Sequence, residues 1–270
     1  MMRPAKSPPV VRVIVWGGVA SFWAVQLTLL LLVGLPLVDT ILLAVLLAAV
    51  PVFSMAQLPL IEDAFIERLP AYWGSIATLW LLGTACWLVG TRVDGAAAIG
   101  VVGIPPGAMA MWAAGLTVAG LGTILAFRWI AIWAGAADTP LLRQLLPHTG
   151  RERGVFVLLS VAAGVGEEVA YRGYAIPVLA PVFGVMGAAA VTSVMFGVVH
   201  GYQGVLGVLR TGIMGGILAW GFISSGSLWP AMIAHTLIDL IAGIVLGERL
   251  LSPESATGVD EGPDLQTSQS

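Results

Sequence analysis

Long apolar runs dominate this chain and restrict what it can fold into. A helix needs about 20 mostly apolar residues to cross a bilayer. The mean hydropathy of +0.96, with only 10% charged residues, lies far above the range of soluble domains. The sequence therefore predicts an all-α, polytopic membrane protein of about eight transmembrane helices. The expected spans are residues 10–33, 37–59, 71–90, 108–134, 154–177, 183–200, 204–224 and 228–247.

Basic residues collect in the loops on one side of the predicted membrane. If the N-terminus is cytoplasmic, the outside loops hold only Arg92. Positively charged loops stay in the cytoplasm, so we expect a multi-pass protein of the plasma (inner) membrane with both termini cytoplasmic. No basic arm suited to nucleic acid occurs, so membrane lipid is the expected surrounding partner. The residues assigned to the inside are Arg3, Lys6, Arg12, Arg68, Arg128, Arg143, Arg151, Arg153 and Arg249.

Three regions follow from the distribution of polar residues. Residues 1–153 contain four apolar spans with almost no polar side chains, which are interpreted as scaffold. A cytoplasmic connection with a short interfacial helix follows these spans. Residues 154–250 contain the chemistry-capable side chains. Residues 251–270 are polar and rich in Pro, Gly and Ser, which predicts a disordered cytoplasmic tail. Cys86 is the single cysteine, so no intrachain disulfide can form.

The stretch GVGEEVAYRGY places two acids and an arginine inside a predicted span. Charged side chains in a bilayer are costly and therefore point to function. Glu168 and Arg172 are four residues apart on one helix face, which favours an ion pair. Glu167 lies about 100° around the helix and is expected to face a separate polar cavity. The alternative is a structural Glu167 bonded to a tyrosine hydroxyl.

Two histidines lie in later spans. His200 follows Phe196 by one turn near a helix end, where a histidine that merely sits at the interface is a plain alternative. His235 and Asp239 are four residues apart and share a face, so an intrahelical hydrogen bond alone would also explain them. Glu167 and His235 are expected at similar depth. A straight sixth helix would place His200 near the cytoplasmic surface, which requires either a helix that starts after a break at residues 177–184 or a cavity open to the cytoplasm.

The ordered set Glu167-Glu168-x-x-x-Arg172, Phe196-x-x-x-His200 and His235-x-x-x-Asp239 resembles the CPBP family, the CAAX protease and bacteriocin-processing (Abi) intramembrane proteases. The resemblance covers roughly residues 154–247. It implies an eight-helix fold whose last four helices form a catalytic cavity, and a membrane-associated or lipidated peptide as substrate. It also implies Glu167 as general base, His200 holding the water, His235 with its partner Asp239 at the oxyanion, and Glu168 and Arg172 as supporting residues.

Asp239 departs from the family pattern, which typically has asparagine there. An ionised aspartate only accepts hydrogen bonds and would repel an oxyanion, so we expect Asp239 to orient and charge His235 or to be protonated. This difference puts CAAX specificity in question.

No metal is required by the spacing, since HExxH is absent. If a divalent metal such as zinc binds, the resemblance implies Glu167, His200, His235 and Asp239 as its ligands. Two other functions stay open from the sequence: a proton-coupled transporter, and a non-proteolytic scaffold or immunity protein. The sequence defines no oligomeric state.

Overall fold

The structure, a computed structural model, describes residues 9–61 and 65–250, and every regular element within them is helical. Seven segments are long and apolar enough to cross a membrane. The predicted all-α polytopic membrane fold is confirmed. The predicted tail at residues 251–270 lies outside the described residues. The elements before the second half are α1 (Pro9–Leu27), η1 (Thr28–Val33), α2 (Leu37–Ala44), η2 (Val45–Ala49), α3 (Val50–Ile61), α4 (Arg68–Gly90), η3 (Gly95–Ile99), α5 (Pro106–Trp133) and α6 (Pro140–Gln144).

The second half forms one long bent segment followed by two spans. The predicted fifth and sixth spans join into a continuous stretch of 50 residues, Gly150–Val199. Such a stretch would be about 75 Å long if straight, against a hydrocarbon core of about 30 Å. The elements are α7 (Gly150–Glu167), η4 (Glu168–Ala175), α8 (Ile176–Val199), η5 (Gly201–Gln203), α9 (Gly204–Ser225), α10 (Trp229–Leu240), η6 (Ile241–Leu246) and η7 (Gly247–Leu250).

Gly184 makes the bend that the sequence placed between residues 177 and 184. Its φ of 70° and ψ of 162° are not helical, and the positive φ is strained for a residue with a Cβ. The chain reverses there, and α8 packs on η4 and α9. Glu167 lies about as many residues before this bend as His200 lies after it. The reversal therefore brings His200 back to the depth of Glu167 and resolves the mismatch expected for a straight helix.

The start of α7 differs from the sequence expectation. Thr149 accepts a hydrogen bond from the backbone N–H of Glu152, and the Glu152 carboxylate accepts one from the N–H of Thr149. This capping box starts the helix at Gly150, so residues that we assigned to the connection form its first turn. The short helix expected in the connection is present as α6.

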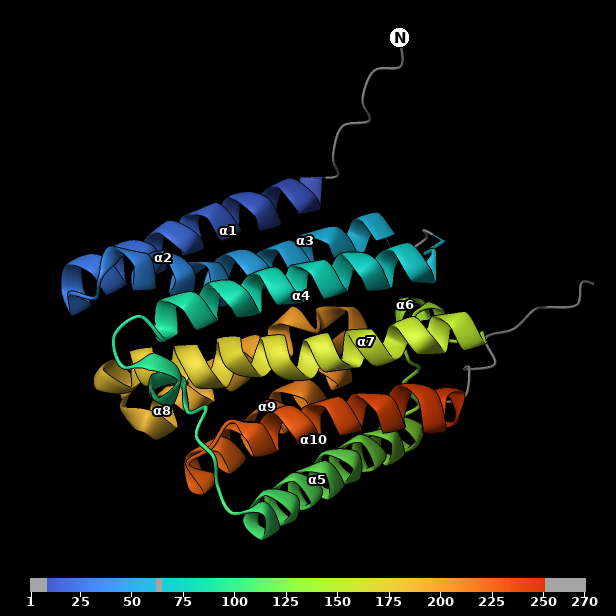
Figure 1. Cartoon of the computed structure of the whole chain (residues 1–270). Helices are drawn as coiled ribbons and strands as arrows, with labels where there is room; N and C mark the ends of the chain where they lie inside the picture. Colours follow the sequence, from blue (N-terminus) through green and yellow to red (C-terminus); the bar gives the residue numbers. More distant parts are fainter. Residues whose placement is uncertain (1–8, 62–64, 251–270) are drawn as a thin grey trace, which may run out of the picture.

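Small residues let the helices around α7 approach closely. A Cβ on Gly164 would lie 2.1 Å from the Thr236 hydroxyl oxygen of α10, and one on Gly83 of α4 would lie 2.8 Å from the Gly166 Cα. Small residues at such contacts allow backbones to pack without a hydrophobic driving force between helices. The segment that ends at Glu167 is therefore held between α4 and α10, as Figure 1 shows.

Large apolar side chains point outward around the bundle, including Leu32, Leu81 and Val118, each more than 70% exposed. Such exposure suits contact with lipid. α1, α4 and α7 begin, and α5 and α10 end, at one end of the bundle (right in Figure 1). The helix-end arginines Arg68, Arg128 and Arg151 thus share that end, while Arg92 follows α4 at the other. The placement of this end in the cytoplasm stays a prediction.

Candidate active site

Glu167 and Glu168 occupy the junction of α7 and η4, where the backbone changes from α-helical to π-helical hydrogen bonding. π-Helical turns are rare and occur often at functional sites. Every residue of η4 is buried, including the charged Glu168 and Arg172. Glu168 pairs with Arg172, as the sequence predicted, whereas Glu167 does not; both acids face His235, so Glu167 does not lie in a cavity separate from Glu168.

Glu168 and Arg172 form a fully buried ion pair. Arg172 Nη1 donates to Glu168 Oε1 at 2.8 Å, and both side chains are 0% exposed. Arg172 Nη2 donates to the Gly215 carbonyl of α9 at 3.0 Å, and its guanidinium carbon lies 4.4 Å from the centre of the Phe196 ring. A Cβ on Gly215 would lie 2.9 Å from Arg172 Nη2, so the absence of a side chain there admits the guanidinium. Arg172 therefore ties η4 to both α8 and α9.

His235 of α10 connects the two acids. Its Nδ1 lies 2.8 Å from Glu168 Oε1. An ionised carboxylate only accepts, so Nδ1 carries the hydrogen and the ring is fixed with Nε2 pointing the other way. Nε2 lies 3.7 Å from Glu167 Oε2 and 3.8 Å from Asp239 Oδ2. These separations exceed a direct hydrogen bond and are spanned by a bridging water in many polar sites.

His200 lies beside this cluster. No hydrogen bond or ion pair joins it to Glu167 within the described residues. It caps the end of α8, and its Nδ1 donates to the Phe196 carbonyl at 2.8 Å. The Phe196 ring centre lies 4.8 Å from that of His200 and 5.9 Å from that of His235. Phe196 thus contacts both imidazoles. Because Nδ1 of His200 carries the hydrogen, its Nε2 is the nitrogen available to accept one.

The proposed tyrosine partner of Glu167 is not present. Tyr171 is 2% exposed, yet its hydroxyl makes no hydrogen bond within the described residues. The side chain of Glu167 is 13% exposed and that of Asp239 is 35% exposed, whereas Glu168 is fully buried. The cluster is therefore open toward Glu167 and Asp239 and closed behind Glu168.

The described residues contain no group of three His, Cys, Asp or Glu side chains arranged to hold a metal ion. His235 already uses Nδ1 on Glu168, so only its Nε2 could bind an ion. The four residues named for a metal by the resemblance do not fit one in this geometry, so no chemical step is derived through it.

The sequence analysis missed the link between the first spans and the site. Asp39 of α2 is 3% exposed, forms a bidentate ion pair with Arg92, and accepts a hydrogen bond at 3.0 Å from the Tyr174 hydroxyl of η4. Ser54 of α3 donates to the Val199 carbonyl, directly before His200. Asp39 is the single charged residue of the span 37–59, and that was the available signal. The first spans thus contact η4 at Tyr174 and the end of α8 next to His200.

Residues 151–241, roughly a third of the chain, match the family described as type II CAAX prenyl endopeptidase Rce1-like. The resemblance drawn from the motifs is confirmed, and the match contains all six of the candidate residues. Searches of curated proteins and of solved structures found no match. The segment that holds the polar cluster is therefore similar to that family.

Proposed function

We propose that this chain, whose residues 151–241 carry the CAAX-type protease match, is an intramembrane endopeptidase that hydrolyses a peptide bond of a membrane-associated or lipidated protein. One observation carries the proposal: Glu167 and His235, 68 residues apart in sequence, face each other at 3.7 Å in a buried polar cluster surrounded by lipid-facing helices.

Glu167 is the proposed general base. It is the more exposed member of the acid pair and is not neutralised by Arg172, which Glu168 occupies. A carboxylate next to His235 Nε2 can hold a water and remove its proton as the water oxygen attacks the substrate carbonyl carbon. The same proton then passes to the leaving amine as the carbon–nitrogen bond breaks. Such proton transfer contributes about 10²- to 10⁴-fold to a rate.

The imidazoles have different proposed roles. His200 is held by the Phe196 carbonyl so that Nε2 can accept a hydrogen bond from the attacking water. His235 is held by Glu168, and an N–H at its Nε2 can donate to the oxyanion that forms on the substrate carbonyl. Asp239 Oδ2 faces the same nitrogen at 3.8 Å, beyond a direct hydrogen bond, and its negative charge favours a protonated imidazole. Asp239 therefore supports a charged His235 instead of contacting the oxyanion.

The test is cleavage by purified protein in lipid nanodiscs. Peptides with a prenylated cysteine four residues from the C-terminus are compared with unprenylated peptides of the same sequences, and products are identified by mass spectrometry. We expect cleavage by the wild type and a loss of about 10²-fold or more with Glu167→Gln or His200→Ala. Glu67→Gln is the matched control, because Glu67 is exposed and its side chain makes no capping bond.

The outcomes separate the alternatives. A wild type that cleaves no peptide, or a Glu167→Gln variant that cleaves as fast as the wild type, would favour a scaffold or transporter. Loss of cleavage on chelation, restored by zinc, would require a metal-bound arrangement different from the one described. We expect Asp239→Asn to retain more activity than Asp239→Ala, because the amide keeps a polar oxygen facing His235.

A further inference from the structure

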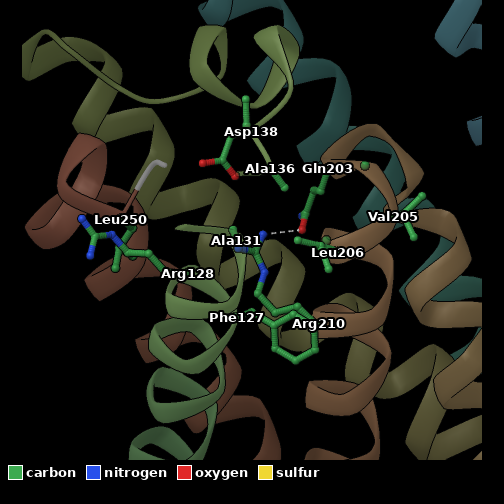
Figure 2. A pocket seen from close by; sticks show the side chains of 13 residues that line it. Phe127, Arg128, Ala131, Ala136, Asp138, Gln203, Val205, Leu206, Arg210 and Leu250 are labelled. Atoms are coloured by element: carbon green, nitrogen blue, oxygen red, sulfur yellow. Dashed lines mark hydrogen bonds between the residues drawn. The ribbon is translucent and has the colours of Figure 1, made fainter. Parts of the chain in front are cut away.

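A second polar pocket lies away from the Glu167–His235 cluster. It has a volume of about 160 Å³ and is enclosed by the end of α5, the connection at residues 136–138, and the beginning of α9. Figure 2 shows Arg210 beside Gln203, Asp138 above them, and Arg128 on the opposite side with its guanidinium directed toward Leu250. Nothing in the proposed hydrolysis uses this pocket.

Its two arginines are placed differently. Arg210 Nη2 donates to Gln203 Oε1 at 2.8 Å, and Thr211 donates to the same oxygen at 3.1 Å, which fixes the guanidinium at the pocket wall. Arg128 Nε is buried and makes no hydrogen bond within the described residues. Asp138 also lines the pocket, and its negative charge acts on Arg210. Two arginines and one aspartate leave the lining with a net positive charge.

The surroundings place this pocket at a membrane surface. Trp129 and Trp133, in the last turns of α5, are 74% and 83% exposed. Exposed tryptophans at the end of a spanning helix are typical of the headgroup layer. Val205 is 78% exposed and Phe127 lines the pocket, so an apolar side adjoins the charged one. The pocket therefore suits a molecule with an anionic head and apolar chains.

We propose that this pocket binds the phosphate of an anionic phospholipid between Arg128 and Arg210, with the acyl chains lying along α5 and α9. Basic pockets between helices at this level favour anionic headgroups. The positive end of α9, which begins at Gly204, adds to the attraction.

Occupancy of the pocket also bears on His200. Gln203 belongs to η5, which follows His200 directly, and the backbone N–H of Gln203 donates to the His200 carbonyl at 3.0 Å. A lipid phosphate that holds Arg210, and through it the bonded Gln203, restrains η5. The orientation of His200, which directly precedes η5, is then restrained as well. This coupling rests on the proposed function, whereas the binding itself does not.

Binding is tested with the full chain in phosphatidylcholine nanodiscs that contain increasing phosphatidylglycerol, with retained lipid counted by native mass spectrometry. We expect the wild type to retain phosphatidylglycerol, and Arg128→Gln and Arg210→Lys each to weaken retention about fivefold, as expected for the loss of one well-placed basic contact. Arg12→Gln is the matched control, since Arg12 is an exposed arginine near the beginning of α1, at the same end of the bundle.

Three arms decide the result. In the first arm, inorganic phosphate is added to the protein in nanodiscs of phosphatidylcholine alone, which distinguishes a free anion from a lipid. If phosphate saturates the pocket and phosphatidylglycerol is not retained, the proposal is overturned. Displacement of the lipid by a peptide acid but not by its amide would assign the pocket to a peptide carboxylate and overturn it as well. Equal retention by Arg128→Gln and Arg12→Gln would also refute it. Cleavage measured with and without phosphatidylglycerol then tests the coupling to His200 separately.

Discussion

Removal of the Glu168 carboxylate should destabilise the fold far more than removal of the Glu167 charge. Glu168 Oε1 accepts from both Arg172 and His235, each at 2.8 Å, and the Glu168 and Arg172 side chains are 0% exposed. In Glu168→Ala, Arg172 keeps only the Gly215 carbonyl and the Phe196 ring, so a buried charge loses its counterion.

The expected size follows from these contacts. Loss of one partner from a buried ion pair costs about 3–5 kcal/mol, because the remaining charge stays desolvated. Glu168→Gln keeps an acceptor oxygen for both donors and loses only the charge, so its cost should be intermediate. Glu168→Ala with Arg172→Met removes both charges and should recover part of the loss of Glu168→Ala, since buried pairs replaced together cost little. The unfolding free energy of Glu167→Gln should remain within about 1 kcal/mol of the wild-type value, because the Glu167 carboxylate makes no hydrogen bond within the described residues.

The assay is reversible unfolding in mixed detergent micelles, followed by tryptophan fluorescence or steric trapping, with these four variants and Arg172→Met compared under one set of conditions. A Glu168→Ala variant less than about 1 kcal/mol below the wild type would refute the reasoning. So would a double variant that is less stable than the sum of its two single changes. Either result would mean that the pair is hydrated or rearranged in the folded protein.

Two further changes probe the packing around the site. Gly164→Ala places a methyl group against Thr236 and should push α7 away from α10, which lowers both the stability and any cleavage rate. Gly154→Ala is the control: no atom lies within 4 Å of the added carbon, so both quantities should stay unchanged in the same assays. Tyr174→Phe removes the hydrogen bond to Asp39 and should cost about 1 kcal/mol in detergent unfolding; no loss of stability would show that Arg92 alone satisfies that carboxylate.

Local features of the sequence were sufficient for the architecture. The predicted spans agree with the structure to within a few residues, except that the fifth and sixth form one continuous stretch, because about 20 consecutive apolar residues are enough to define a spanning helix. The Glu168–Arg172 pair was also predictable, since four residues bring two side chains onto the same helix face. A break from Pro177 to Gly184 was visible in the sequence, although its depth in the bundle was not.

Contacts between distant residues were decided by the tertiary structure alone. The sequence placed His235 beside Asp239, but its Nδ1 bonds Glu168 across 67 residues and its Nε2 faces Glu167. The rotation of each helix about its axis determines such contacts, and that rotation depends on where small residues such as Gly164 let neighbouring backbones meet. The sequence by itself determined which helices cross the membrane and which polar residues they carry. Only packing decided which of those polar residues face one another, because hydrophobicity toward lipid does not specify a partner.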